Sequence, residues 1–222
     1  MTDQPIVMIV LLAALSLLPF LLVMLTSFVK IAVVLAIVRN ALGAGNIPPS
    51  MVVTGLALVL TMFVMAPVAG QVYDRVEPAL AAAQGKSLTS TETVTSLVRA
   101  GERAGEPIRE FLTKHAHARD RAMFTDLARR MREPAARADV SDSDFMVLAP
   151  AFVTSELKEA FAIGFLLFIP FLVIDMVVSN VLLSLGMHMM SPSTVSLPFK
   201  LLLFVLIDGW QLLTQGLVLG YT

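Results

Sequence analysis

Asp175 and Lys200 are charged side chains within the most apolar stretch of this 222-residue sequence, residues 160–204. Asp175 stands in the first apolar arm, AFAIGFLLFIPFLVIDMVVSNVLLSLG, and Lys200 stands in the second, LPFKLLLF, with the turn MHMMSPSTVS between them. A charge is strongly destabilising in an apolar medium unless an opposite charge or hydrogen bonds compensate it. The chemistry to expect here is therefore ion pairing, within a helical hairpin formed by the two arms.

Two interpretations of Lys200 stay open from its position alone. A basic side chain near a helix end can extend to the membrane interface without any partner. However, Lys200 follows Pro198 and lies on the same helical stripe as Asp208, which favours a partner. The carboxylates available to pair with it, and so to stabilise assembly, are Glu156, Glu159, Asp175 and Asp208.

Three methionines, Met187, Met189 and Met190, lie in the turn between the two arms. One interpretation is that they are simply turn residues or lipid contacts. Methionine is also unbranched and adaptable, so several methionines together suit a seal around chains of variable shape. The turn itself needs little apolar surface, which favours the seal.

The sequence carries no motif of bond-making chemistry. His115 and His117 are two residues apart, a spacing that points two side chains to opposite sides of a helix and argues against a metal pair. The spacings HExxH, GxSxG and GxGxxG and the P-loop pattern do not occur. The chain has no cysteine, which excludes disulfides, cysteine-ligated zinc and thiol catalysis. We therefore expect neither an enzyme nor a cofactor or metal site.

The composition is that of a membrane protein, because 57% of the residues are hydrophobic and only 15% are charged. An ordinary soluble domain has about a quarter of its residues charged. Of the charges, 13 of 16 Lys and Arg and 14 of 17 Asp and Glu fall in residues 74–159. The chain thus divides into an apolar segment over residues 1–73, a polar insert over residues 74–144 and a second apolar segment over residues 145–222. The net charge of −1, with both signs mixed in the insert, argues against nucleic acid as a partner.

The first apolar segment predicts a helical hairpin. Residues 6–38 form one apolar run, about 50 Å long as a helix, against about 30 Å of hydrocarbon in a membrane. Pro48 and Pro49, within ALGAGNIPPS, mark the hairpin turn. Ser50 is then placed to cap a second apolar helix over residues 51–68.

The rest of the chain is also expected to be helical. Residues 107–131 place apolar side chains at helical spacings, and residues 141–144 resemble a helix start. The final helix, expected over residues 195–219, carries one polar stripe within about 120° of its circumference. The members of this stripe are Lys200, Asp208, Gln211, Thr214 and Gln215. The stripe should face protein or water.

Basic residues in the two hairpin turns predict the orientation in the membrane. The turns, residues 39–50 and 186–200, contain Arg39 and Lys200 and no acidic residue. By the positive-inside tendency, both turns lie on the cytoplasmic side. The polar insert and both termini are then expected in the periplasm.

Five separated blocks of the sequence resemble the FliP/YscR (SctR) family of inner-membrane export proteins, found in flagella and in type III secretion injectisomes. In order, the blocks are LTSFVKIAVVLAIVRNALG followed by PP, GLALVLTMFVMAPV, PIREFL, SELKEAFAIGFLLFIPFLVIDMVVSNVLLSLGM and SLPFKLLLFVLIDGW. The resemblance runs over residues 25–213 and is weakest over residues 79–105. The ending QGLVLGY and the lack of a signal-peptide pattern favour the injectisome branch over the flagellar one.

The resemblance implies an all-α membrane protein whose long apolar hairpins flank a small helical polar insert. It implies that five copies form a ring with SctS-like and SctT-like subunits, in contact with membrane lipid and other export-gate proteins. It further implies hairpins that stand largely above the membrane plane, on the periplasmic side. Met187, Met189 and Met190 would then line the pore as a gasket. The recurrence of the motifs SELK and LPFK favours Glu156, in the same or a neighbouring subunit, as the partner of Lys200.

Two functions of different classes are therefore considered. The first is a structural pore-forming subunit of a type III export gate, which forms the entry channel for unfolded secreted proteins at the bacterial inner membrane. The alternative is a small-solute or ion transporter or channel, in which charges within the membrane mark the pathway. Transporters commonly show internal repeats with paired broken helices, and the two apolar segments show no convincing repeat. A scaffold without any lumen is a third, weaker interpretation.

Overall fold

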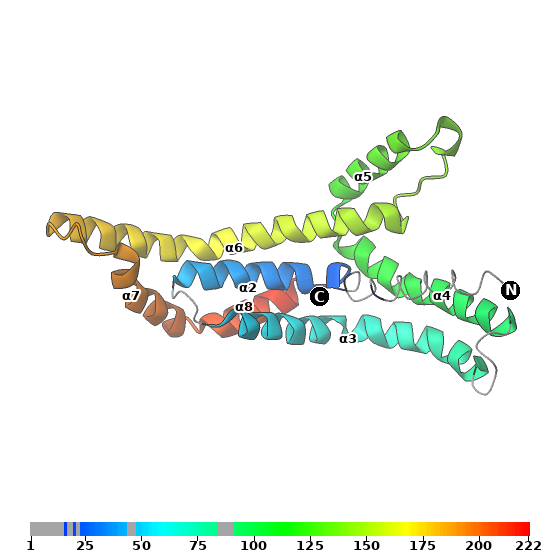
Figure 1. The fold of residues 1–222 in the computed structure, drawn as a ribbon, viewed down its shortest axis with the longest axis horizontal. Coiled ribbons are helices and arrows are strands. Elements are labelled where there is room, and N and C mark those ends of the chain that lie inside the picture. Colours follow the sequence, from blue (N-terminus) through cyan, green and yellow to red (C-terminus); the bar gives the residue numbers. More distant parts are fainter. Residues whose placement is uncertain (1–15, 17–19, 21–22, 44–47, 84–90) are drawn as a thin grey trace. The chain divides into compact units, whose positions relative to one another are not determined.

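The structure is a computed structural model, and it describes residues 16, 20, 23–43, 48–83 and 91–222. These residues form helices and connecting turns and contain no strand, which confirms the all-α prediction. The helices are α2 (Phe28–Leu42), α3 (Ser50–Ala83), α4 (Thr91–His115), α5 (Ala118–Met131), the short 3-10 helix η1 (Pro134–Ala136), α6 (Phe145–Ser184), α7 (Pro192–Leu206) and α8 (Gly209–Leu219) (Figure 1).

The described chain forms two compact units. The first comprises Met65–Glu156 with the described residues up to Ser27, and the second comprises Phe28–Val64 with Leu157–Thr222. Two of the unit limits fall within α3 and α6. The division of the chain after residues 73 and 144 stays a prediction. The second unit contains both apolar hairpin turns.

The prediction of one helix over residues 6–38 is wrong in the part that the structure describes. A turn at residues 25–27 separates α2 from the helical residues before it, and α2 then continues past the predicted end to Leu42. The Thr26 hydroxyl donates to the Val23 carbonyl over 3.1 Å. Such a local bond gives the backbone an alternative to uninterrupted helix, which explains a break at the polar residues of this run.

Helix α3 begins as predicted at the Pro48–Pro49 turn, but its cap and its end differ from the prediction. The Pro49 carbonyl accepts the N–H groups of Val52 and Val53 at 3.0 and 3.2 Å, so Pro49 rather than Ser50 occupies the cap position. The helix ends at Ala83 instead of residue 68 and contains Pro67 and Pro78. Its polar second half belongs to the first unit.

Within the first unit, the predicted helical stretch 107–131 is two helices. Ala116 and His117 separate α4 from α5, and Ser155 of α6 accounts for the break. The His117 N–H donates to Ser155 Oγ, and Ser155 Oγ donates to Asp120 Oδ2, each over 2.9 Å. Ser155 and Asp120 are buried, so this polar bridge holds the start of α5 to α6. Phe111 packs on Phe152 beside it, with ring centroids 5.7 Å apart.

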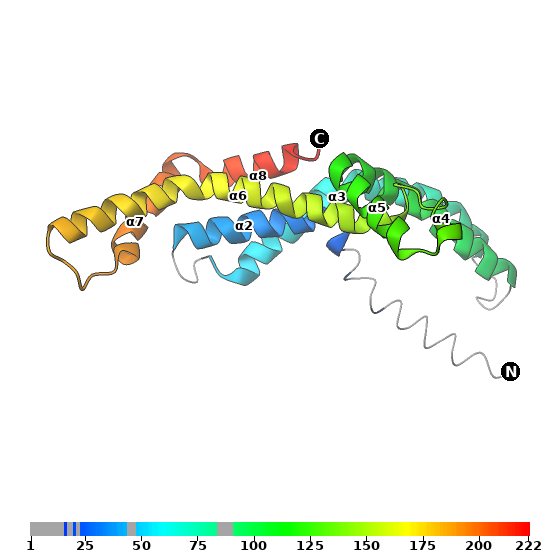
Figure 2. The same ribbon diagram turned by 90° about the horizontal axis from the view of Figure 1, so that it is seen from above.

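The second unit is organised around α6 and α2, which run alongside each other (Figures 1 and 2). Asp144 starts α6, as predicted from residues 141–144: its carbonyl accepts the N–H groups of Val147 and Leu148. Farther along, Gly164 of α6 faces Ile37 of α2 so closely that any β-carbon at Gly164 would overlap the isoleucine. The absence of a side chain there allows the two helices to approach closely.

The predicted final helix over residues 195–219 is wrong, because α7 and α8 are separate helices bent by 59°. Asp208, between them, has left-handed backbone angles (φ 51°, ψ 48°), which an uninterrupted helix cannot contain. Gly209 is buried against the Phe204 ring in the space where a β-carbon would stand. The bend depends on this contact, and an apolar periodicity does not reveal it.

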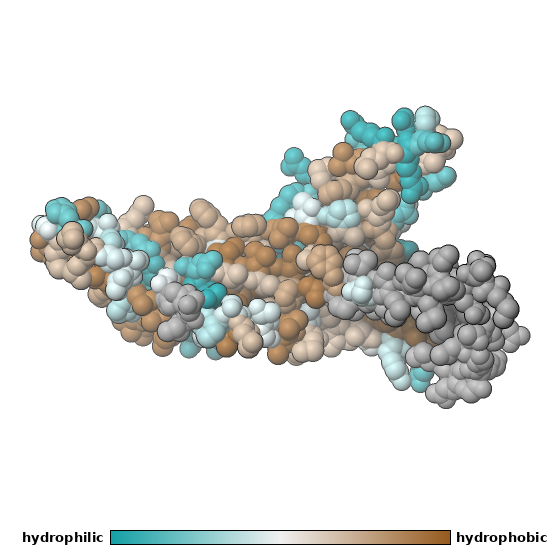
Figure 3. Space-filling view, viewed as in Figure 1, coloured by the Kyte–Doolittle hydropathy of each residue, from teal (hydrophilic) through white to brown (hydrophobic). Residues whose placement is uncertain are grey.

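Two described helices are long and apolar enough to cross a membrane: Ser50–Pro78 within α3, and α6. A third span results if the bent pair α7 and α8 counts as one. Helix α6 has 40 residues, about 60 Å at 1.5 Å per residue, or about twice the hydrocarbon thickness. In the view of Figure 3, hydrophobic residues dominate the surface over α6 and α2, and hydrophilic residues gather over α5.

Candidate functional site

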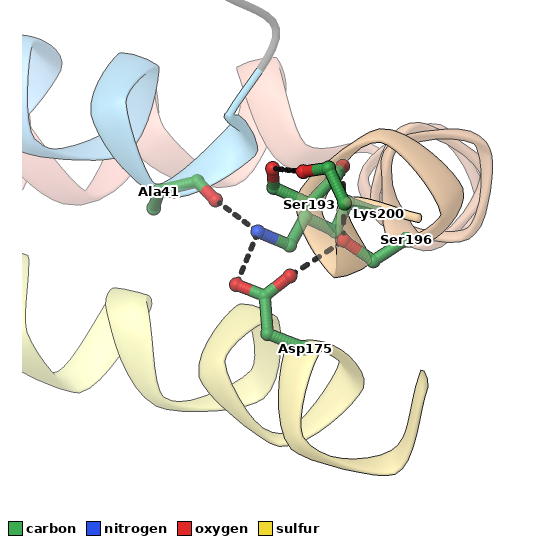
Figure 4. Close-up of polar contacts among 6 residues, drawn as sticks. Ala41, Asp175, Ser193, Ser196 and Lys200 are labelled. Carbon is green, nitrogen blue, oxygen red and sulfur yellow. Dashed lines mark hydrogen bonds and ion pairs between the residues drawn. The ribbon is translucent and has the colours of Figure 1, made fainter. Parts of the chain in front are cut away.

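Lys200 is buried at the centre of a polar cluster in the second unit (Figure 4). Its ammonium Nζ is 2.6 Å from Asp175 Oδ2 and donates to the Ala41 carbonyl over 3.1 Å. The Ser196 hydroxyl donates to the other carboxylate oxygen of Asp175 over 2.5 Å. We call Asp175, Ser196, Lys200 and the Ala41 carbonyl the charge lock. It joins the last turn of α2 to α6 and α7.

The local sequence places each member of the charge lock. Ser196 and Lys200 are four residues apart on α7 and so share one face of that helix. Ala41 lies in the last turn of α2, where backbone carbonyls lack partners within the helix and a cation is favoured. Gly43 follows with a left-handed φ of 68°, and a β-carbon there would lie 3.5 Å from Lys200 Nζ. The Lys200 ammonium thus bonds a backbone carbonyl in the last turn of α2 and also pairs with Asp175.

Within one chain, Lys200 pairs with Asp175, which was one of the four candidates. Pairing with Glu156 of a neighbouring subunit stays a prediction. Lys200 is 3% exposed, so it does not extend to an interface. Lys200 pairs with Asp175 because the hairpin turn brings α7 back along α6, so that Lys200 lies next to Asp175 of the same chain.

The other predicted carboxylates have different surroundings. Glu156 is buried within α6, in the first unit. Glu159 pairs with Lys30 of α2, with 2.7 Å between Oε2 and Nζ. Asp208 is exposed at the bend between α7 and α8. Lys30 is also a lone cation in an apolar run, as Lys200 is. The cost of an unpaired charge in an apolar medium could therefore have predicted a carboxylate partner for Lys30 from the sequence.

The methionine turn, which we define as residues 185–191, has a fixed backbone and exposed side chains. Gly186 is left-handed (φ 72°), its N–H bonds the Leu183 carbonyl, and the Met187 N–H bonds the Leu182 carbonyl over 2.9 Å. This is the hydrogen-bond pattern of a Schellman helix end. The exposed fractions are 41% for Met187, 100% for Met189 and 44% for Met190. Met189 is therefore not needed to pack the turn, and Met187 and Met190 are only partly covered.

The bend at Asp208 divides the predicted polar stripe. Lys200 points into the charge lock, whereas Gln211, Thr214 and Gln215 of α8 line a groove of about 500 Å³. Leu60 and Phe63 of α3 and Val218 complete its lining. The groove is open and its polar wall consists of amide and hydroxyl groups, which carry no charge.

The described residues hold no group of three or more His, Cys, Asp or Glu side chains that could bind a metal. His115 lies in α4 with its ring 4.7 Å from the Phe111 ring, and His117 precedes α5. The features that stand out are two ion pairs with buried lysines and one turn with exposed methionines. The ion pairs hold neighbouring helices together, and the turn exposes methionine side chains.

Comparison with known proteins identifies the family. Residues 11–217 match the FliP family. The chain belongs to this family. The FliP-family relatives include Yop proteins translocation protein R of Yersinia pestis, 48% identical over 96% of this chain and 95% of the relative. Hypersensitivity response secretion protein HrcR of Ralstonia nicotianae is 45% identical over 96% of each chain. Flagellar biosynthetic protein FliP of Pectobacterium carotovorum subsp. carotovorum is 48% identical over 96% of this chain and 77% of its own.

These relatives confirm the resemblance seen in the sequence, including its injectisome-type members. FliP-family relatives are named for secretion, translocation or flagellar biosynthesis, and none of the three above is named for an enzymatic activity. The chain is thus a member of a protein-secretion family with helices apolar enough to span a membrane.

Proposed function

We propose that this chain is a pore-forming subunit of a type III export gate in the bacterial inner membrane, through which unfolded proteins enter the secretion pathway. The observation that carries the proposal is the methionine turn: in a chain of the FliP family, the fully exposed Met189 follows directly after a Schellman helix end. Flexible thioether side chains on a rigid support suit a seal that yields to a passing polypeptide.

The buried charges favour this function over solute transport. A transporter uses ionisable groups along its pathway, and these groups face a cavity or water. The lysines Lys30 and Lys200 are instead buried, and each pairs with a carboxylate of α6, Glu159 or Asp175, that is 36% or 37% exposed. Each pair joins α6 to another helix, which favours a structural role. The proposed gate contains several copies of the chain, five by resemblance to the family, together with SctS-like and SctT-like subunits.

The number of copies in one particle tests the proposal. Coexpression with the two smaller subunits and native mass spectrometry of the purified complex should give a single particle with about five copies of this chain. The exposed apolar surface of α6 supports this expectation, because ten or more large side chains there need cover from lipid or from other subunits. A particle with one copy would support the transporter instead.

The orientation in the membrane is a second part of the proposal, in which residues 74–144 face the periplasm and the methionine turn faces the cytoplasmic side. Because the chain has no cysteine, single cysteines report their own positions. Met131→Cys, at a site 88% exposed in the insert, should react with an impermeant thiol reagent added outside intact cells. Ser191→Cys, in the methionine turn, should react only after the inner membrane is opened. The reverse pattern would invert the topology.

A further inference from the structure

Helix α8 is attached to the second unit at its two ends. At its start, the chain bends by 59° at Asp208, and Gly209 packs against the Phe204 ring. At its far end, the chain leaves the helix in a turn in which the Tyr221 N–H bonds the Val218 carbonyl over 3.0 Å. Tyr221 lies in this turn and is only 7% exposed.

The Tyr221 ring lies over the buried ammonium of Lys30. The distance from Lys30 Nζ to the ring centroid is 4.2 Å, and the same nitrogen is 2.7 Å from Glu159 Oε2. Lys30 is 2% exposed. An ammonium over the face of an aromatic ring is attracted by the quadrupole of the ring, and the attraction is larger where water is excluded. Three parts of the second unit meet at this nitrogen: α2, α6 and the chain that follows α8.

Tyr221 also continues the inner face of α8. Leu213, Leu217 and Tyr221 are spaced by four residues and all three are buried. With this row facing inward, Gln211 and Gln215 are exposed and line the groove beside α3. The apolar row buries surface without a preferred partner atom, whereas the ring over Lys30 contacts one particular atom, Lys30 Nζ.

We propose that Tyr221 is a positioning residue that acts through Lys30: its aromatic ring, held over the ammonium that Glu159 pairs from α6, fixes the placement of α8 and of its polar groove. The inference concerns the folded chain alone and does not depend on the proposed role in export. A leucine at this position would keep an apolar side chain of smaller volume but would not attract the cation, and the double variant with Lys30→Met separates the lost attraction from the lost volume.

Trp210, the single tryptophan of the chain, reports the placement of α8. It is the second residue of the helix, and its ring meets the Phe204 ring edge-on at 5.3 Å between centroids and 89° between planes. Any shift of α8 against α7 alters this contact. The test is the fluorescence emission and acrylamide quenching of Trp210 in the full chain, purified in detergent, with Tyr221→Phe, Tyr221→Leu and Lys30→Met variants.

Removal of the Tyr221 ring and removal of the Lys30 cation should have similar effects on Trp210. We expect Tyr221→Phe, which keeps the ring over Lys30, to shift the emission less than Tyr221→Leu. Tyr221→Leu and Lys30→Met should each shift the emission maximum and increase quenching. Adding Tyr221→Leu to Lys30→Met should change little further, since the two residues contribute through one shared contact. If Lys30→Met does not accumulate as folded protein, the comparison of Tyr221→Phe with Tyr221→Leu decides alone.

Two results would overturn the inference. The first is unchanged Trp210 emission in Tyr221→Leu. The second is an equal effect of Tyr221→Leu with and without Lys30, which would make Tyr221 a space-filling residue only. An effect of Tyr221→Phe as large as that of Tyr221→Leu would assign the placement of α8 to the hydroxyl instead of the ring.

Discussion

Lys200→Glu should prevent stable assembly of this chain into the export gate. The substitution places a carboxylate beside the Asp175 carboxylate and the Ala41 carbonyl, so an ion pair and a hydrogen bond become two repulsions. The loss of the pair alone amounts to between about 1 kcal/mol for an exposed pair and about 3–5 kcal/mol for a buried one. Asp175 is 37% exposed and Lys200 4% by side chain, which places this pair between the two limits. The measurement is the amount of assembled complex recovered from membranes.

Two charge exchanges separate the Asp175 pair from the predicted Glu156 pair. Asp175→Lys with Lys200→Glu restores opposite charges in the charge lock and should recover part of the assembly. Recovery stays partial, because a carboxylate at position 200 cannot donate to the Ala41 carbonyl as Lys200 does. Glu156→Lys with Lys200→Glu should recover nothing. If only the Glu156 exchange restores assembly, the decisive partner of Lys200 belongs to a neighbouring subunit.

The helical hairpin and its turn could be predicted because their signals are local. Apolar runs of sufficient length, Pro48 and Pro49, and the residues that start α6 each act on the backbone within a few positions. The lone charges Asp175 and Lys200 in the apolar arms also predicted ion pairing. In the structure these two charges pair with each other.

The breaks and the partners could not be predicted, because they depend on contacts made across the fold. The break at Asp208 needs the Phe204 ring against Gly209, and the break before α5 needs Ser155, which is 38 residues from His117. Neither contact alters the apolar periodicity. The choice of Asp175 over Glu156 likewise depends on how far α7 returns along α6.

Replacement of Met187, Met189 and Met190 with alanine should leave assembly intact and make the closed gate leak. All three side chains are exposed, Met189 fully, and the backbone bonds at the start of the turn join Gly186 to Leu183 and Met187 to Leu182. Each substitution shortens a side chain at the proposed constriction, and the loss is repeated in every copy around the ring. Substitutions at exposed positions usually change stability by no more than about 0.5 kcal/mol. The folded chain should therefore persist while the seal opens.

A matched control is available elsewhere on the chain. Met131→Ala, together with Met123→Ala, removes exposed methionines from α5, outside the proposed constriction. This variant should assemble and remain as tight as the unchanged protein. Leakage in both variants would indicate general damage to the membrane.

Ion conductance of membranes that contain the assembled complex tests the pore most directly. We predict a low conductance for the unchanged gate and for the α5 control, and a clearly higher conductance for the triple alanine variant at equal amounts of complex. An assembled triple variant as tight as the unchanged gate would contradict a seal formed by the methionine turn.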